Sequence, residues 1–266
     1  MSRDPIAVIV LAAGMGTRMK SDLPKVLHRV AGRPMLDIVL DEAAKLKPAR
    51  TIVVVGPDTP GVAERAQAHT LKPRIAVQTQ RLGTAHAVRA AQKALGTFRG
   101  TILIVYGDCP LMRAETLKRV TRALKRKSAP ALSWFSFAPD DVAGYGQFVL
   151  GERGAPERIV EAKDLTPETN PSGLCWGGVM AGDGRHFFKL LAKVGRANKQ
   201  KEYYLTALIE IARKQGLASV LVDGAVEEAL GVNSRFDLAI VEQEMQHRLR
   251  MEALAGGVTM IDPTNV

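Results

Sequence analysis

The chain has 266 residues, of which 46% are hydrophobic and 24% charged, with 24 glycines and 14 prolines. This composition excludes a disordered or collagen-like chain, and the length suits one large domain or a main domain with a small appendage. Two cysteines, Cys109 and Cys175, cannot hold a fold of this size together by disulfides, which favours a reducing compartment. The apolar run at residues 6–13 is far shorter than the ~20 residues that span a bilayer, so we expect a cytoplasmic protein without membrane insertion.

The net charge of +10 is suited to an anionic partner. Nucleic acid is one class of such partners, and nucleotides and sugar phosphates are another. The basic residues are scattered, with the densest run at 118–127, and only 5% of residues are aromatic, so platforms for base stacking are scarce. We therefore expect small phosphorylated substrates and no nucleic acid, and we interpret the basic run as a solvated helix face.

Apolar, strand-forming runs alternate with helical periodicity through the first 125 residues. The pattern predicts helices from about 34, from about 60, at 84–94 and at 114–125, and strands at 6–11, 51–55, 74–77 and 101–106. Strands that are apolar throughout and separated by helices are typical of a parallel sheet covered on both faces. We therefore predict an α/β, Rossmann-like fold that binds its ligands at the carboxyl ends of the strands.

The pattern changes after residue 130. Shorter strand-like pieces are separated by Pro, Asp and Gly turns, at 132–137, 147–150, 158–160 and 177–180. They predict a small antiparallel insertion that walls a pocket. Helices are then expected at 185–194 and 202–214, a strand at 218–222 and a long closing helix at 234–253.

The strongest local signal lies at the end of the first predicted strand, in residues 11–19 (LAAGMGTRM) with Lys25 shortly after. Small residues let backbone N–H groups approach an anion, and Arg18 and Lys25 add positive charge, so the segment suits phosphates. It is neither a dinucleotide fingerprint, which needs a third glycine where Met19 stands, nor a GxxxxGK[ST] loop. A tight turn that packs under a helix is the alternative interpretation.

Further blocks follow in order at 78–87 (QTQRLGTAHA), 106–111 (YGDCPL), 144–146 (GYG), 159–164 (IVEAKD), 202–206 (EYYLT) and 231–233 (GVN). Together with residues 11–35 they resemble the sugar-1-phosphate nucleotidyltransferases. Within that family the resemblance is greatest to the N-acetylglucosamine-1-phosphate uridylyltransferase (pyrophosphorylase) domains of bifunctional bacterial enzymes, and it covers essentially the whole chain. It implies Mg²⁺-dependent transfer of UMP from UTP to N-acetylglucosamine 1-phosphate, with pyrophosphate as the second product.

Two residues are candidates for holding the metal ion. Asp108 follows a predicted strand at the edge where a parallel sheet binds ligands, so it could hold Mg²⁺ against a triphosphate, although a turn residue before Pro110 is the alternative. Asn233 stands at the start of the last predicted helix, where an N-cap is the ordinary explanation for it or for Ser234. The resemblance implies that Asn233 is the second metal ligand.

The resemblance also assigns the remaining roles. Arg18 and Lys25 would be the catalytic residues that neutralise the phosphates. The residues that would bind the nucleotide and read its uracil are Ala12, Ala13, Gly14, Gln78, Gly83 and Thr84. Those that would hold the sugar, or close over it, are Gly144, Glu161, Trp176, Tyr204 and Thr206. His86 is interpreted as structural.

Three positions depart from the family pattern. Trp176 stands where the pattern has Asn, Gln147 where Arg is common, and Ala207 where Asp is usual. An indole in place of a compact amide stacks on the sugar, changes specificity or impairs binding, unless it is simply a core tryptophan. A nucleotidyltransferase for another sugar 1-phosphate and a nucleotide-binding protein with impaired catalysis are therefore the alternatives.

We divide the chain into a nucleotidyltransferase domain at 1–233 and a C-terminal helix and tail at 234–266. The relatives continue into a left-handed β-helix of hexapeptide repeats that transfers acetyl groups, and no such repeat is present here. We expect no acetyltransferase activity, and the oligomeric state stays open.

Overall fold

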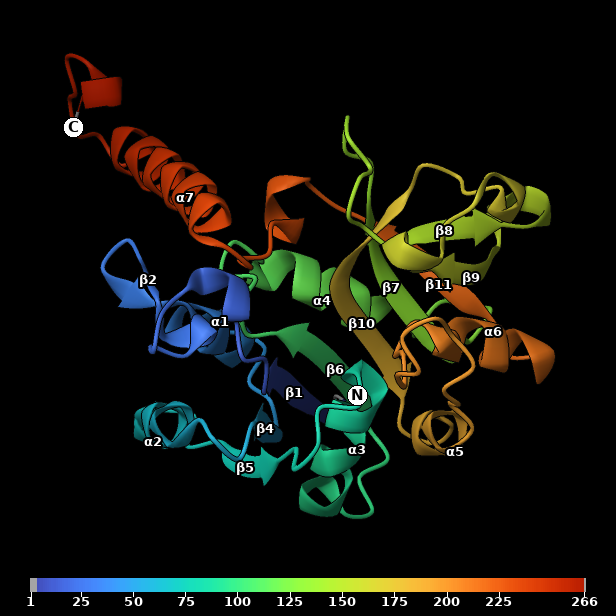
Figure 1. Cartoon of the computed structure of the whole chain (residues 1–266). Helices are drawn as coiled ribbons and strands as arrows, with labels where there is room; N and C mark the ends of the chain where they lie inside the picture. The colour runs from blue at the N-terminus through green and yellow to red at the C-terminus, as the bar shows by residue number, and fades with distance from the viewer. Residues whose placement is uncertain (1–3, 266) are drawn as a thin grey trace.

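Alternating apolar side chains let one sheet bury both of its faces. In the computed structural model, which describes residues 4–265, β1 (Ile6–Ala12) lies between β4 (Arg50–Val55) and β6 (Thr101–Tyr106) and is parallel to both (Figure 1). The edge strand β5 (Arg74–Val77) pairs in parallel with β4. These strands were predicted to within a residue or two, and the α/β, Rossmann-like fold class is confirmed.

Helices cover the sheet on both sides. On one face α1 (Met35–Ala44), α2 (Pro60–Ala68) and α4 (Ala114–Ala123) pack on alternate strand residues such as Val8 and Val10. On the other face Ala7 and Ile9 meet α3 (Thr84–Leu95), α5 (Phe187–Ala192) and α6 (Ala207–Lys214). The period of two along the strand therefore explains why there are two cores.

The expected antiparallel insertion is only partly right. Of its four predicted strands, β7 (Leu132–Phe137) and β10 (Cys175–Asp183) belong to the central sheet, in the order β11-β7-β10-β6-β1-β4-β5, with β11 at Ser219–Asp223. Only β10 runs antiparallel to its neighbours β6 and β7. The small antiparallel part is β8 (Gln147–Leu150) with β9 (Pro156–Val160), which extends from the start of β10.

Two predicted helices are shorter than expected. The helix expected at 202–214 begins only at Ala207, because the backbone of residues 203–205 is hydrogen-bonded to residues 82–85 instead of to a helical turn. The helix expected at 185–194 is limited to α5. Short 3₁₀ helices, which the sequence pattern did not indicate, lie at Thr17–Met19, Lys25–Leu27, Glu152–Gly154, Ala162–Asp164, Pro167–Thr169, Glu227–Ala229 and Pro263–Asn265.

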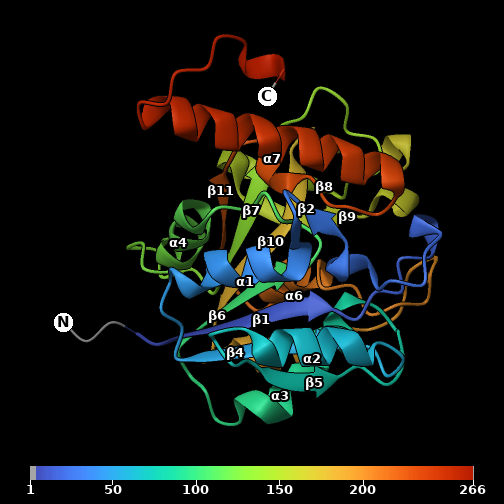
Figure 2. The same cartoon turned by 90° about the vertical axis from the view of Figure 1, so that its left-hand side faces the viewer.

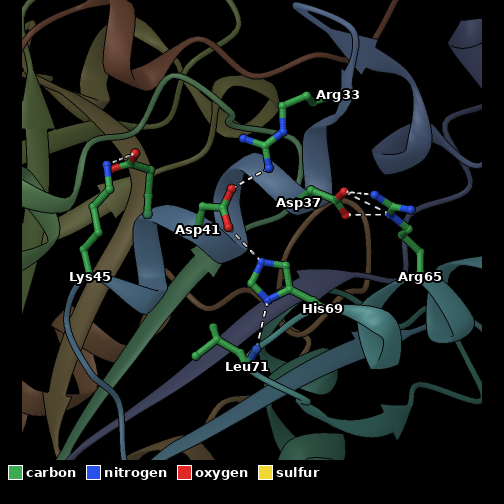
Figure 3. Close-up of polar contacts among 8 residues, drawn as sticks. Arg33, Asp37, Asp41, Lys45, Arg65, His69 and Leu71 are labelled. Atoms are coloured by element: carbon green, nitrogen blue, oxygen red, sulfur yellow. Dashed lines mark hydrogen bonds and ion pairs between the residues drawn. The ribbon is translucent and has the colours of Figure 1, made fainter.

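Polar contacts join α1 to its neighbours (Figure 3). Asp37, buried on α1, accepts hydrogen bonds from the guanidinium of Arg65 on α2. Asp41, one turn further on, pairs with Arg33 and lies 3.0 Å from Nε2 of His69. Nδ1 of that ring accepts from the Leu71 N–H, so Nε2 carries the proton and donates to Asp41. These contacts fix α1 against α2.

The long helix α7 (Arg235–Ala255) lies across the top of the molecule in Figure 2, above the small hairpin of β2 (Arg29–Val30) and β3 (Arg33–Pro34). No helix within residues 4–265 is long and apolar enough to cross a membrane. Cys109 and Cys175 are both buried and free, in agreement with the expectation that they form no structural disulfide.

Candidate functional site

The carboxyl ends of the two central strands bring the glycine-rich turn and Asp108 together. Leu11 of β1 pairs with Tyr106 of β6, and the Gly107 N–H donates a 2.9 Å hydrogen bond to the Leu11 carbonyl. Residues 12–19 and 107–111 therefore leave the sheet side by side. This edge is where a parallel sheet offers free backbone groups to a ligand.

Three side chains from distant parts of the chain meet at this edge. The Lys25 ammonium forms an ion pair with the Asp108 carboxylate and donates a 3.0 Å hydrogen bond to Oδ1 of Asn233. The Lys25 and Asp108 side chains are only 12% and 17% exposed. The backbone joins the same segments, because the Val232 N–H donates to the Asp108 carbonyl at 2.9 Å. The structure thus brings together three of the residues that were predicted from distant motifs.

Asn233 is not the cap of α7. Oγ of Ser234 accepts a hydrogen bond from the Asp237 N–H, and the Asp237 carboxylate accepts from the N–H groups of Ser234 and Asn233 at 2.8 and 2.9 Å. This capping box satisfies the helix end without the Asn233 side chain. The Asn233 amide oxygen is therefore directed to the Lys25 and Asp108 site rather than to the helix.

The donor set fits a magnesium ion. One carboxylate and one amide oxygen already converge on a cation, the Lys25 ammonium. Mg²⁺ takes oxygen ligands and usually keeps water and substrate phosphates in the rest of its shell, so two protein oxygens suffice. Residues 4–265 contain no cluster of three or more His, Cys, Asp or Glu side chains that would suit a different metal.

The glycine-rich turn wraps around Lys25. Gly16 has a φ of +66°, and a Cβ at this position would lie 2.6 Å from Cβ of Lys25. Only glycine provides both the positive φ and the close approach. Arg18 follows as an exposed residue of the 3₁₀ helix Thr17–Met19, so both predicted catalytic side chains lie at the same turn.

A first cavity of about 250 Å³ opens beside this turn. Gln78 is buried in its wall, where its amide N–H donates to the Gly83 carbonyl at 3.1 Å and lies 3.2 Å from Nδ1 of His86. His86 thus orients Gln78, which agrees with the structural role expected for it. The cavity brings together most of the residues predicted to bind the nucleotide; its lining is Leu11, Ala13, Gly14, Gln78, Arg81, Gly83, Thr84, Ala87, Tyr106, Asp108 and Glu202.

Arg81 was not singled out from the sequence. Its Nε donates a 2.8 Å hydrogen bond to the Ala13 carbonyl, and its guanidinium also pairs with Asp58. It therefore holds the glycine-rich turn in place while it lines the first cavity. Its position inside the 78–87 block was the only signal that could have identified it.

A second cavity of about 400 Å³ adjoins the first, and the two share Tyr106 and Asp108. Five predicted residues line it, from the turn, the metal pair and the sugar group: Arg18, Asp108, Gly144, Trp176 and Asn233. The Asp108 carboxylate therefore lies at the junction of the two cavities. Tyr106 and Tyr145, which were not predicted as site residues, also line the second cavity.

Trp176 is both a core side chain and part of this wall. It is 9% exposed and makes edge contacts with Tyr106 and Trp134, with ring centroids 5.7 and 5.9 Å apart. Its indole N–H has no hydrogen-bond partner among the described residues. Trp176 is therefore a core tryptophan that also belongs to the lining of the second cavity.

Lys25 meets the cavities only through its contacts with Asp108 and Asn233, and four other predicted residues line neither cavity: Ala12, Glu161, Tyr204 and Thr206. The Thr206 hydroxyl donates a 2.7 Å hydrogen bond to Glu161, whose other oxygen lies 3.4 Å from where a Cβ on Gly146, a residue of the second cavity, would stand. Burial raises the pKa of Glu161, and the Thr206 hydrogen bond works against that rise. Burial, with help from nearby carboxylates, raises the pKa of Tyr204 to about 12. Glu161 and Thr206 therefore support the wall of the second cavity instead of forming it.

The segment 203–205 is joined to the turn at 82–85. The Tyr203 N–H donates to the Leu82 carbonyl, the Ala85 N–H to the Tyr203 carbonyl, and the Leu205 N–H to the Thr84 hydroxyl, at 2.8 to 2.9 Å. The Arg89 guanidinium lies 4.5 Å from the centre of the Tyr203 ring and anchors to the end of α5. The predicted base-reading turn and sugar-closing segment therefore form one unit.

Comparisons with known proteins find similar sequences. Residues 8–164 match the family model of the MobA-like NTP transferase domain. A protein of Rhodospirillum rubrum named bifunctional protein GlmU is 48% identical over 260 residues, which are 98% of this chain and 57% of that protein. A Paramagnetospirillum magneticum protein of the same name is 45% identical over 267 residues, 100% of this chain and 58% of its own length. The chain thus spans less than two thirds of the length of these relatives.

Among solved structures, the chain resembles 4-diphosphocytidyl-2C-methyl-D-erythritol synthase from Anaerococcus prevotii. The TM-score is 0.65 at 15% sequence identity, and the match covers 91% of this chain and 99% of that one. At this identity the likeness concerns the fold alone.

Proposed function

The chain belongs to the family of MobA-like NTP transferase domains, and we propose that it transfers UMP from UTP to N-acetylglucosamine 1-phosphate. The products are UDP-N-acetylglucosamine and pyrophosphate. The choice of this sugar and of uracil comes from the ordered sequence blocks, which resemble those of the uridylyltransferases.

One observation carries the proposal: Asp108, which shares the Lys25 ammonium with Asn233, lines both cavities. Gln78, Gly83 and Thr84 line one of them, and Gly144 and Trp176 the other. A nucleoside in the first and a sugar in the second would bring their phosphates together at the charged junction. Such placement is what an in-line displacement requires.

In the reaction, a phosphate oxygen of the sugar 1-phosphate attacks the α-phosphorus of UTP. A new P–O bond forms, the bond from the α-phosphorus to the bridging oxygen breaks, and pyrophosphate leaves with that electron pair. The attacking phosphate is already an anion near neutral pH, so no general base is needed. The work of the protein is alignment and charge neutralisation by Arg18, Lys25 and the backbone N–H groups of the glycine-rich turn.

Asp108 and Asn233 are the residues that would hold Mg²⁺. The ion would neutralise charge on the triphosphate and orient it. Lys25 would then exchange its contacts with the two oxygens for a contact with phosphate, since the glycine-rich turn packs against its side chain.

A second candidate is a nucleotidyltransferase for another sugar 1-phosphate, and Trp176 favours it. An indole without a hydrogen-bond partner stands where the family pattern has a compact amide, in the wall of the second cavity. The other two departures from the family pattern are Gln147, which is buried, and Ala207, which begins α6.

Pyrophosphate release tests both candidates. The chain is incubated with Mg²⁺, UTP or CTP, and either N-acetylglucosamine 1-phosphate or glucose 1-phosphate, and the product is identified by mass. We expect turnover with UTP and N-acetylglucosamine 1-phosphate. Equal turnover of glucose 1-phosphate would refute the sugar assignment, and UTP binding without turnover of either sugar would favour a binding protein.

A further inference from the structure

The helix α7 does not cover the central sheet. Its two buried side chains, Val241 and Met245, belong to a separate apolar cluster. The other buried members of that cluster all come from segments around the site: Met19, Val30, Met35, Ile38, Leu111 and Val232. Figure 2 shows the helix lying across the hairpin of β2 and β3. Its packing partners are therefore the loops that form the site and their supports.

Polar anchors accompany this apolar contact. Nε of Arg235 donates a 3.1 Å hydrogen bond to the carbonyl of Met19, the residue after Arg18. Nη2 of Arg248 donates at 3.0 Å to the carbonyl of Leu111, three residues after Asp108. The Met19 carbonyl thus lies at the end of the turn that carries Arg18, and the Leu111 carbonyl at the end of the loop that carries Asp108.

The same helix holds the other two segments. The Asp237 carboxylate accepts from the Asn233 N–H at 2.9 Å. The Glu242 carboxylate accepts at 2.7 Å from the N–H of Ala31, in the hairpin turn that follows Lys25, and Gln246 holds that carboxylate at 2.8 Å. Spacings of four, four and three residues place Asp237, Val241, Met245 and Arg248 on one helix face, and Glu242 and Gln246 lie one residue further on, along its edge.

Partial burial of the Arg248 guanidinium costs free energy, which its hydrogen bond to the Leu111 carbonyl must offset. Burial lowers the pKa of this arginine, and the nearby Arg113 adds to the lowering. A guanidinium taken partly out of water is unfavourable unless good hydrogen bonds replace the lost hydration. Its bond to Leu111 provides one, whereas an apolar residue at this position would fill the space without holding the loop.

We infer that Arg235 and Arg248 of α7 are positioning residues, which set the turn of Arg18 and the loop of Asp108 at the geometry that the transfer requires. The inference rests on the proposed function for its kinetic part. Arg248 acts on the loop of the metal ligand, and Arg235 acts on the phosphate-binding turn. Loss of the Arg248 hydrogen bond should therefore affect metal binding, and loss of the Arg235 hydrogen bond should affect turnover.

The test compares Arg248→Met and Arg235→Met with the conservative Arg→Lys variants. Binding of Mn²⁺ without nucleotide is measured by electron paramagnetic resonance, and kcat and KM by pyrophosphate release. Arg248→Met should weaken Mn²⁺ binding about 10-fold, as expected for a partner that orients a metal ligand. Arg235→Met should leave Mn²⁺ binding unchanged and lower kcat about 10-fold through misplacement of Arg18. The lysine variants should recover part of each loss.

His247→Ala is the matched control, because His247 is exposed on the same helix and precedes Arg248. Variants that behave like this control, or whose losses in binding and turnover are equal and follow the loss of folded protein, would overturn the inference. A wild-type chain that binds Mn²⁺ but releases no pyrophosphate would refute the proposed function, while the Arg248 comparison would still decide the inference. A wild-type chain that binds no Mn²⁺ would refute the metal pair and the inference with it.

Discussion

The Lys25 ammonium donates a 3.0 Å hydrogen bond to the side-chain oxygen of Asn233, which lies 208 residues further along the chain. The same ammonium pairs with Asp108, so a lysine cation takes the place between the two oxygens that are proposed to hold Mg²⁺. Under the proposed function, lysine and metal ion would therefore compete for the same two oxygens in the free protein, and would cooperate only when a triphosphate is present to receive the lysine.

Substitution of Lys25 should separate these two roles. Lys25→Met should lower kcat about 10²-fold or more, as for the loss of a charged donor from a dry site. Binding of Mn²⁺ in the absence of nucleotide should become tighter, because the competing ammonium is gone. Turnover assays and titration by electron paramagnetic resonance measure the two effects. Lys20→Met, at an exposed lysine of the same loop, is the control. Weaker Mn²⁺ binding in Lys25→Met would contradict the competition.

The turn at Gly83 should tolerate no side chain. Its φ is +108°, and a Cβ there would lie 2.6 Å from the Tyr203 carbonyl oxygen. The backbone conformation alone costs about 1–3 kcal/mol for a residue other than glycine. Gly83→Ala should thus lower the free energy of urea unfolding by at least this amount and raise KM for UTP, because Gln78 bonds to the Gly83 carbonyl.

Gly195→Ala provides the comparison for Gly83. Gly195 has no atom within 4 Å of an added Cβ and no positive φ. Its substitution should change neither unfolding nor KM. Equal behaviour of the two alanine variants would show that the close approach to Tyr203 is unimportant.

Glu161 should make stability depend on pH. Burial raises its pKa above the usual 4.5, so the folded state binds the carboxyl proton more tightly than the unfolded state does. The contribution to stability is then greatest below pH 4.5 and is lost as the pH rises through the folded pKa. Glu161→Gln removes this dependence, so its Tm should exceed that of the wild type at pH 7 and the difference should vanish near pH 4.

Melting curves of both proteins between pH 4 and pH 8 measure this effect, with Glu152→Gln, at an exposed carboxylate, as the control. A wild-type chain that gains stability relative to Glu161→Gln as the pH rises would contradict the direction of the shift. Glu161→Gln should also raise KM for the sugar 1-phosphate, because the carboxylate supports the cavity wall at Gly146.

Trp176 and Trp134 offer a matched pair for sugar specificity. Both indole N–H groups are buried without a partner among residues 4–265, and the two rings touch, but only Trp176 lines the second cavity. Trp176→Phe should raise KM for the sugar 1-phosphate ~10-fold and leave KM for UTP unchanged. Trp134→Phe should change stability but neither KM. If Trp176→Phe altered only stability, the tryptophan would be a core residue alone.

The order of strands and helices was largely determined by local pattern. The strands at 74–77, 101–106, 132–137 and 147–150 were predicted with the boundaries that the structure has. Runs of apolar residues between turn signals identify a buried strand because both of its faces must exclude water. The glycine-rich turn and Asp108 could also be placed from the sequence, since each directly follows such a strand.

The partners of each strand and side chain were decided by tertiary structure. Nothing in the pattern of residues 175–183 shows that this strand would lie in the central sheet between β6 and β7, because the neighbours of a strand depend on the path of the chain and not on local side chains. The same holds for the meeting of Lys25 with Asn233 and for the bonds of Arg235 and Arg248 to loop carbonyls. Such contacts join residues far apart in sequence, and only packing of the whole chain brings them within hydrogen-bond distance.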